Sequence, residues 1–487
     1  MKLLSIGVVL VSLLASAASS SKVPSNAKVV LPASFEPPKA FKNQNLVHII
    51  SLEKNYVKEN INVLIENVSP GLIDEYFLPF TADQFARVGG IEVNDRKDPN
   101  AGPFEVRPVE YDNASDTQYY RIRFPKALKS GTHQTIGISF YYLKAYSPLP
   151  AAIKQDEKQY LTYDFSAFCQ SAYTTVKQKT EVKFPSTDIP DYTTIGEGPQ
   201  NQGSKLVYGP YGEQAAFAKA PARVRFEFTK PVIHVAKLER DVEVSHWGGN
   251  VAFEERYDLY HRGANLSSQF SRVKWQKSQY HSPATHALKE LKFPLKIGSI
   301  DPYYTDVIGN VSTSRFRSNK REALLEAKPR YPIFGGWKYP FTIGWNTDAS
   351  SSLRKTKSGE FVLNIPFLEG PKQPEGVEYG EVRLQVLLPE GAQNVKYYTN
   401  IPQAAVTEAS IGIRKTYLDT VGRTAVVISA KNIVDEFRNR EVIISYELPL
   451  SAILRKPFVV FVSMLGVFVA GWIIGGLDFG ISRGAKK

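Results

Sequence analysis

The chain has 487 residues and a formal net charge of +12, with 43% hydrophobic and 22% charged residues. This composition is typical of a folded globular chain and excludes a disordered stalk. Lys and Arg are scattered along the chain without long basic runs, which favours a solvated basic surface and argues against nucleic-acid binding.

The N-terminus has the pattern of a secretory signal peptide. Lys2 precedes an apolar run over residues 3–14, and Ala15 and Ala17 follow at the A-x-A spacing of a cleavage site. We expect a signal peptide over residues 1–18, cut after Ala17 or Ala18, because the run is too short to span a membrane stably. A buried core helix is the alternative interpretation.

The region between residues 19 and 453 has the pattern of a mainly β protein. Apolar and polar residues alternate in RVRFEFT (223–229), QTIGISFYY (134–142), GEVRLQVLL (380–388) and EVIISYEL (441–448). Turns rich in Gly, Pro, Asn and Asp separate these runs, which favours antiparallel β-sandwiches over a βαβ architecture. We expect two sandwich-like lumenal domains, residues 19–238 and 239–453, with short helices at HALKELK (286–292) and KREALLEA (320–327).

The only cysteine, Cys169, excludes an intramolecular disulfide. It lies among aromatic and small residues in YDFSAFCQSAY, which favours a buried inert thiol over a nucleophile. For a secreted chain, the lack of disulfides indicates domains large enough to be stable without them.

Near the C-terminus, residues 457–477 form an uncharged apolar run of 21 residues. As a helix this run is about 31 Å long, which matches the hydrocarbon core of a bilayer. We expect a transmembrane helix over 454–479 and a short cytosolic tail over 480–487, with the bulk of the chain lumenal. A glycosylphosphatidylinositol signal is the competing interpretation, but such a signal ends apolar and SRGAKK does not.

Catalytic motifs are not found in the sequence. The seven histidines are dispersed, and no zinc-protease, nucleophile-elbow, phosphate-loop or dinucleotide pattern occurs. Glu254 and Glu255 are adjacent, so a strand would point them to opposite faces, unlike the paired carboxylates of a glycosidase. We therefore expect no catalytic, cofactor or metal site. A lumenal carbohydrate-active enzyme and a β-sandwich adhesion or receptor ectodomain stay open as alternatives.

Four N-glycosylation sequons occur, at Asn67, Asn113, Asn265 and Asn310. Pro70 follows the sequon of Asn67 and disfavours its modification, so Asn67 ranks last. The other three are expected at the surface.

Two segments combine glycines with many aromatic residues: 246–272 and 331–346. Glycine pairs allow close backbone approach, and aromatic rings supply contact area. The segments are either a packing cluster inside the domain or a partner contact, for which Trp247, Phe334 and Trp337 are the candidates.

At these segments the sequence resembles the ribophorin I family, subunit 1 of the oligosaccharyltransferase complex. The resemblance rests on three blocks in the family's order: His246-Trp247-Gly248 through Arg272, Ile308 through Ser314, and Pro332 through Lys338. It implies an accessory, non-catalytic subunit of the endoplasmic reticulum enzyme that transfers an oligosaccharide from a dolichyl-diphosphate lipid to Asn-x-Ser/Thr. The implied partners are a catalytic many-span subunit with a W-W-D-x-G motif, small membrane subunits and nascent polypeptides. Animal members have a long cytosolic tail, whereas this chain resembles the fungal form.

The predicted membrane helix contains two G-x-x-x-G spacings, Gly471/Gly475 and Gly476/Gly480. This spacing lets helices approach closely in a membrane and is a candidate packing face for a partner helix. The alternative is that glycine is simply frequent in such helices.

Overall fold

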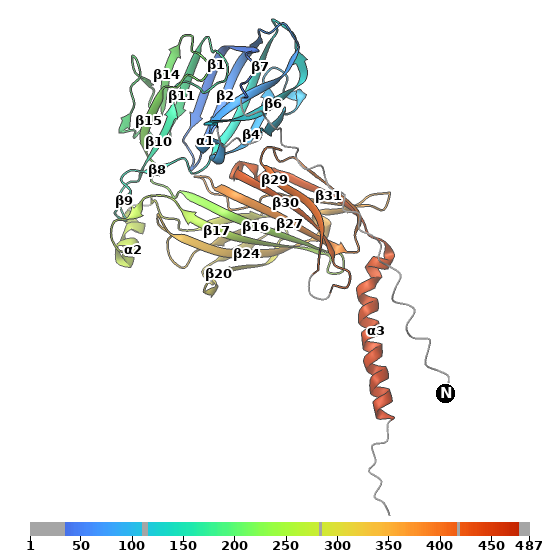
Figure 1. Ribbon diagram of the computed structural model, residues 1–487. Helices are drawn as coiled ribbons and strands as arrows, with labels where there is room; N and C mark the ends of the chain where they lie inside the picture. The colour runs from blue at the N-terminus through green and yellow to red at the C-terminus, as the bar shows by residue number, and fades with distance from the viewer. Residues whose placement is uncertain (1–34, 110–114, 282–284, 416–418, 477–487) are drawn as a thin grey trace, which may run out of the picture.

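The computed structural model describes residues 35–109, 115–281, 285–415 and 419–476. Figure 1 shows two β-rich domains stacked on one another and one long helix leaving the second domain. Strands dominate both domains, which confirms the prediction of a mainly β chain. The predicted signal peptide lies outside the described residues.

The first domain is built on a seven-stranded sheet in the order β13-β14-β11-β1-β2-β7-β4. Its strands are β1 (Phe41–Ser51), β2 (Val57–Asn67), β4 (Val88–Asp95), β7 (His133–Tyr142), β11 (Gln178–Lys183), β13 (Gln200–Asn201) and β14 (Lys205–Tyr211). The pairing is antiparallel except between β1 and β11, which are parallel. Every second residue of β2 is buried, so one face of the sheet covers the core.

Two smaller sheets pack on this large sheet. One is β3-β6-β5 and the other is β12-β15-β10-β8. Their strands are β3 (Ile73–Thr81), β5 (Glu105–Pro108), β6 (Thr117–Leu128), β8 (Ser147–Pro148), β10 (Tyr160–Ser166), β12 (Asp191–Tyr192) and β15 (Pro221–Glu227), with α1 (Ala82–Arg87) and the 3-10 turn η1 (Pro99–Ala101) beside them. One hydrophobic cluster contains Ile61 of β2, Ile122 of β6 and Phe226 of β15, as expected for a sandwich-like core.

The second domain has an eight-stranded sheet in the order β21-β20-β24-β17-β16-β27-β30-β29. Its strands are β16 (Ile233–Ser245), β17 (Asn250–His261), β20 (Ile300–Asp306), β21 (Gly309–Asn310), β24 (Lys338–Asp348), β27 (Glu378–Glu390), β29 (Val406–Arg414) and β30 (Arg423–Val434). Strands β16 and β27 are its parallel pair. The predicted domain boundary at 238/239 falls inside β16, so we propose to place it just before Ile233.

Two further sheets complete the second domain: β25-β26-β31-β28 and β19-β23-β22. The remaining elements are β19 (Leu291–Leu295), β22 (Arg315–Ser318), β23 (Ala323–Ala327), β25 (Leu353–Lys355), β26 (Phe361–Pro366), β28 (Gln393–Thr399), β31 (Glu441–Glu447), the 3-10 turns η2 (Ala349–Ser351) and η3 (Asp435–Asn439), and the helices α2 (Arg272–His281) and α3 (Leu450–Gly475). Val382, Ile444 and Phe293 share one hydrophobic cluster, so all three sheets contribute to one core.

The two short helices predicted in this domain are wrong. Residues 323–327 form β23, and the segment 286–292 leads into β19, with which β23 pairs. Ala323, Leu325 and Ala327 are buried at every second position, the period of a strand. The helix that does occur here is α2.

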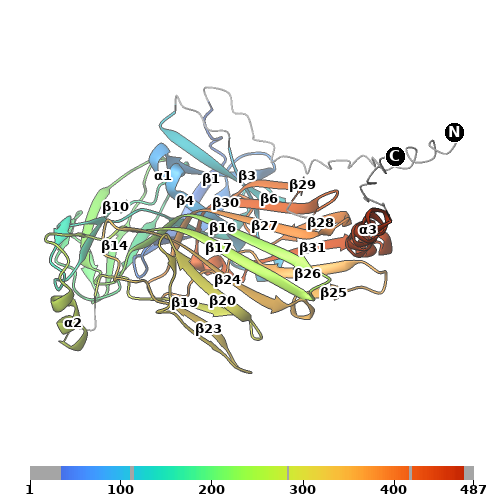
Figure 2. The same ribbon diagram turned by 90° about the horizontal axis from the view of Figure 1, so that it is seen from below.

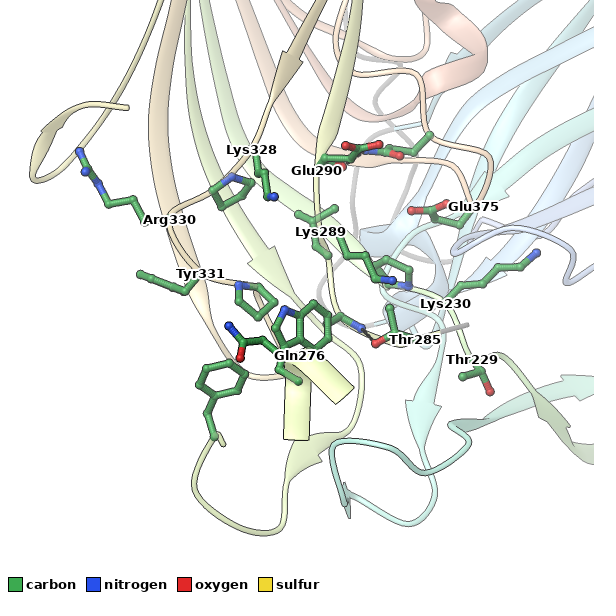
Figure 3. A pocket seen from close by; sticks show the side chains of 18 of the residues that line it. Thr229, Lys230, Gln276, Thr285, Lys289, Glu290, Lys328, Arg330, Tyr331 and Glu375 are labelled. Atoms are coloured by element: carbon green, nitrogen blue, oxygen red, sulfur yellow. Dashed lines mark hydrogen bonds between the residues drawn. The ribbon is translucent and has the colours of Figure 1, made fainter. Parts of the chain in front are cut away.

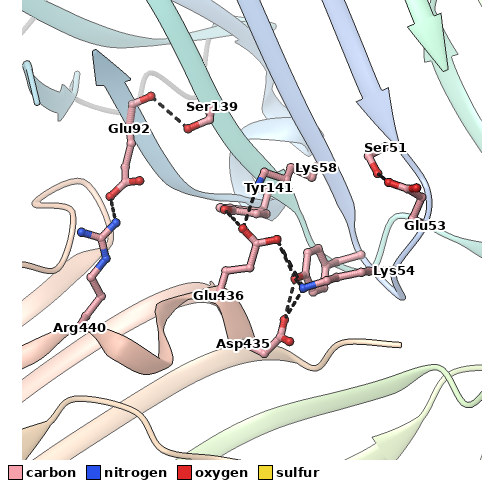
Figure 4. A network of polar contacts seen from close by, with 11 residues as sticks. Ser51, Glu53, Lys54, Lys58, Glu92, Ser139, Tyr141, Asp435, Glu436 and Arg440 are labelled. Atoms are coloured by element: carbon pink, nitrogen blue, oxygen red, sulfur yellow. Dashed lines mark hydrogen bonds and ion pairs between the residues drawn. The ribbon is translucent and has the colours of Figure 1, made fainter. Parts of the chain in front are cut away.

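A polar network joins the two domains (Figure 4). Lys58 Nζ lies 2.6 Å from Glu436 Oε2, and the Tyr141 hydroxyl donates to the same carboxylate at 2.8 Å. Beside them the Tyr56 hydroxyl donates to Asp435 Oδ1 at 2.6 Å. The short strands β9 (Ala152–Ile153) and β18 (Asn265–Leu266) also pair across the junction. These contacts fix the first domain on the second.

Candidate interaction surfaces

The three sequence blocks that suggested a family lie side by side in the second domain. The first block contains the β16–β17 turn and β17, the second contains β21, which follows β20 in a hairpin, and the third leads into β24. In the sheet β24 lies between β17 and β20. The three blocks therefore belong to strands of one sheet or to the turns beside them.

The aromatic residues of the third block are mainly packing residues. Phe334 is fully buried, and the ring of Trp337 lies 5.7 Å from it. Phe270 and Trp275 bring two more rings to within 5.6 and 5.7 Å of Phe334. The prediction of Phe334 as a partner contact is wrong because its ring fills the core, whereas Trp337 is partly exposed.

The glycine pair of this block allows two backbones to touch. A Cβ atom at Gly335 would lie 2.0 Å from the carbonyl oxygen of Ala264. Beside it, His261 Nδ1 accepts from Gly263 N at 3.1 Å, and Nε2 donates to the carbonyl of His286 at 2.6 Å. Burial lowers the pKa of His261 to about 4, so the ring is neutral at pH 7.

A cleft of about 850 Å³ opens between α2 and the interdomain junction (Figure 3). Its walls carry the aromatic rings of Trp275 and Tyr331, and Lys289 Nζ lies 5.6 Å from the centre of the Trp275 ring. Burial lowers the pKa of Lys289 and raises that of Glu375. The cleft is also lined by Lys230, Arg272, Gln276, Lys328 and Gln373. Aromatic walls with convergent cationic and amide groups can hold a short polar segment of a polypeptide or glycan.

Trp247 contacts the chain's own C-terminal helix. Pro457 inside α3 has no N–H, so the carbonyl of Ile453, four residues earlier, lacks its helical donor. The indole Nε1 of Trp247 donates to this carbonyl at 3.1 Å. Trp247 remains 65% exposed, so the rest of its ring is available at the junction with the membrane.

Two further contacts hold the start of α3 on the second domain. Lys456 Nζ lies 3.0 Å from Asp419 Oδ1, whose side chain is fully buried. Ala452 packs against Gly391, where a Cβ atom would lie 2.6 Å from the Ala452 methyl group. Figure 2 shows α3 beside the sheet that contains β28 and β31. The first turns of α3 are therefore packed on the second domain.

The Trp247 contact leads to a double-variant test. We expect Trp247→Phe, which keeps an aromatic ring but removes the N–H, to lower the free energy of unfolding of the full chain by about 1 kcal/mol. In a Pro457→Ala background the same change should have little effect, because the backbone N–H of the introduced alanine supplies the missing helical donor. Thermal unfolding of the four proteins in detergent measures both values. If Trp247→Phe lowers the free energy of unfolding equally in both backgrounds, the hydrogen bond from Trp247 does not replace the helical donor that Pro457 lacks.

Helix α3 is the one described helix long and apolar enough to span a membrane. It begins at Leu450, four residues before the predicted start, and its apolar side chains are exposed. No atom lies near the Cβ positions of Gly471 and Gly475, so this face is uncovered within the described chain. Gly476 is the C-cap residue that follows the helix, and Gly480 lies outside the described residues.

The sequons differ in accessibility. Asn265 and Asn310 are exposed. Asn67 is fully buried, and its Nδ2 donates to the carbonyls of Gly71 and Leu128 at 2.9 and 2.8 Å. Asn113 lies outside the described residues.

The residues considered for catalysis have structural partners. Glu255 is buried and pairs with Arg240, while Glu254 on the other face pairs with Arg256. Cys169 is buried, and burial raises its thiol pKa. Among the described residues no group of three His, Cys, Asp or Glu side chains is placed to hold a metal ion.

Fold and surfaces thus define a β-rich, two-domain protein clamped to one helix of membrane-spanning length. The sequence comparisons specify the family. The ribophorin I family model matches residues 41–475, and the chain belongs to this family.

Three relatives carry related names. Subunit 1B of the dolichyl-diphosphooligosaccharide–protein glycosyltransferase of Arabidopsis thaliana is 32% identical over 446 residues, covering 89% of this chain and 92% of the relative. Subunit 1 of Caenorhabditis elegans is 30% identical, covering 92% of this chain and 74% of its own. Subunit 1 of Schizosaccharomyces pombe is 28% identical, covering 89% and 95%. These names give no support to the two rival classes, a free-standing carbohydrate-active enzyme and an adhesion receptor.

Solved structures add little. Native yeast LTA4 hydrolase aligns with 45% of this chain and 29% of its own at 12% identity and a TM-score of 0.26, a similarity too low to support any conclusion.

Proposed function

We propose that the chain is an accessory, non-catalytic subunit of an oligosaccharyltransferase, anchored in the endoplasmic reticulum membrane with both β-domains in the lumen. The observation that carries the proposal is the ribophorin I match over residues 41–475, together with relatives named as subunit 1 of this glycosyltransferase. Its partners are the catalytic many-span subunit, the small membrane subunits and nascent polypeptides.

The non-catalytic role is supported by the functions that the charged residues already have. Arg240 and Glu255 pair with each other between β16 and β17, and Glu436 joins the two domains. These charged residues therefore have structural roles, which is what we expect of a subunit that positions other subunits.

Contact with acceptor polypeptides is supported by the cleft beside α2. A volume of about 850 Å³ suits a few residues of an extended chain. Side-chain amides from Gln276 and Gln373 line it and can pair with peptide groups.

The function is tested by purification of the full chain in mild detergent, followed by mass spectrometry of its partners. We expect a stoichiometric many-span protein with a W-W-D-x-G motif, and oligosaccharide transfer to an Asn-x-Thr peptide by the purified complex. A full-length chain that is recovered alone, or that processes a sugar substrate without partners, would overturn the proposal.

A variant in the membrane helix tests how the subunits associate. We expect Gly471→Leu to reduce recovery of the other membrane subunits, because the added side chain separates helices that pack at Gly471 and Gly475. Gly466→Leu is the matched control, since five residues place Gly466 about 140° away around the helix. Equal loss in both variants, or recovery of the intact complex with Gly471→Leu, would contradict this packing face.

A further inference from the structure

The turn between β20 and β21 presents two aliphatic side chains to solvent. Val307 is 83% exposed and Ile308 is 77% exposed, although both belong to residue types that proteins usually bury. They are adjacent at the tip of a hairpin, and Ile308 begins the block that contains the sequon of Asn310. Their placement therefore needs an explanation beyond packing of this chain.

The tip is held rigidly in its exposed position. Asp306 Oδ1 accepts from the backbone N–H groups of Ile308 and Gly309 at 2.9 and 3.1 Å. Arg330 donates through Nε to Asp306 Oδ2 at 2.6 Å and through Nη2 to the carbonyls of Gly309 and Asn310 at 3.2 and 2.9 Å. Because the side chain of Asp306 is nearly buried, this bracing lies beneath the tip and prevents Val307 and Ile308 from folding back.

The position of the hairpin relates it to the membrane. Figure 1 shows β20 and its turn at the lower edge of the second domain, the side toward which α3 descends. The contacts of Trp247, Ala452 and Lys456 hold the first turns of the helix against this domain. When α3 spans the bilayer, the edge that carries the tip therefore faces the bilayer surface.

We propose that the β20–β21 tip is a second membrane contact, in which Val307 and Ile308 enter the boundary between lipid headgroups and acyl chains. Aliphatic side chains on a rigid turn gain free energy from this boundary without an ordering cost. The Arg330 guanidinium lies behind the tip, at the level of anionic headgroups. The turn and α3 together hold the second domain at two points and set its tilt over the membrane.

This inference rests on the membrane anchorage of α3 and not on the identity of the other subunits. A glycan at Asn310 is compatible with it, because only the two tip side chains enter the lipid and Asn310 stays in the polar region.

The chain allows a clean labelling test because its single cysteine, Cys169, is buried. In a Cys169→Ser background, Ile308→Cys carries an environment-sensitive fluorophore, and Leu72→Cys, 65% exposed in the first domain, is the control. The labelled full chain is reconstituted into vesicles of phosphatidylcholine and phosphatidylserine and checked for integration by carbonate extraction. Quenchers on the lipid acyl chains are compared with soluble iodide.

We expect the label at position 308 to be quenched severalfold more by the lipid quencher than by iodide, at a depth of about 5–10 Å below the surface. The label at position 72 should respond only to iodide. Arg330→Gln, which removes the bracing, should reduce the lipid quenching at position 308. Two results would overturn the proposal: iodide quenching at position 308 equal to that at position 72, or shielding at position 308 that occurs only with the partner subunits present.

Discussion

Arg240→Ala is expected to lower the free energy of unfolding of the full chain by about 3–5 kcal/mol. Arg240 is completely buried in β16, where its guanidinium pairs with Glu255 and donates to Glu369 Oε2 at 2.7 Å. It also lies over the rings of Phe253 and Trp345, at 5.0 and 5.7 Å from their centres. Truncation leaves the Glu255 carboxylate buried without its cation, and burial already raises the pKa of that group.

Chemical denaturation of the full chain in detergent measures the loss as a shift of the midpoint for the second domain. Arg256→Ala is the matched control, because Arg256 also pairs with carboxylates but is 39% exposed, and we expect it to lower the unfolding free energy by about 1 kcal/mol or less. Replacing all three members of the cluster together, with Arg240→Met, Glu255→Leu and Glu369→Gln, should recover most of the stability, because no charge of the cluster is then left without its partner. A loss of the same size in Arg256→Ala and Arg240→Ala would contradict a special role for burial.

The overall architecture was predictable because it follows from patterns within single segments. RVRFEFT forms most of β15, where burial alternates, GEVRLQVLL lies in β27, where residues 384–388 are all buried, and the apolar run near the C-terminus forms α3. Each of these patterns lies within one segment and indicates its secondary structure directly, by period-2 spacing for a strand or by an apolar length that matches a bilayer for a membrane helix.

The two wrong helix predictions show that local helix propensity does not predict the structure where contacts with other strands outweigh it. KREALLEA consists of strong helix formers, yet residues 323–327 pair with β19 on one side and β22 on the other. Helix propensity differs by less than about 1 kcal/mol per residue among such residue types. Burial of Ala323, Leu325 and Ala327 and two rows of backbone hydrogen bonds outweigh it.

For the candidate surfaces, the sequence indicated which segments are rich in aromatic residues and glycine, but it did not indicate which side chains are exposed or what they contact. Trp247 was a candidate contact because of its block, but its partner, the carbonyl of Ile453, lies 206 residues away. Pro457 signals that this carbonyl needs a donor, and the sequence cannot say which residue supplies it. For Phe334 the aromatic neighbours in the sequence suggested an exposed contact surface. In the structure these neighbours enclose its ring, which is fully buried.

Acid is expected to destabilise the second domain through His261 and His286. Burial lowers the pKa of each ring from 6.5 to about 4. Between these values the unfolded chain binds more protons than the folded one, so the contribution of each ring is complete above pH 6.5 and is lost as the pH falls toward 4. A shift of this size corresponds to about 3 kcal/mol per histidine.

The structural reason is clearest at His261. Its Nδ1 accepts from the N–H of Gly263, so a proton on Nδ1 would place two donors face to face at 3.1 Å. Protonation therefore has to move the Gly263 N–H away from the ring, at a place where the next residue, Ala264, packs closely against Gly335. The change in unfolding free energy of the full chain between pH 7 and pH 5 gives the number of protons that the chain takes up when it unfolds. We expect His261→Gln to lower this number by about one. His133→Gln is the control, because it removes an exposed imidazole from the other domain. An unaltered pH dependence in His261→Gln would show that this buried ring does not control the acid response.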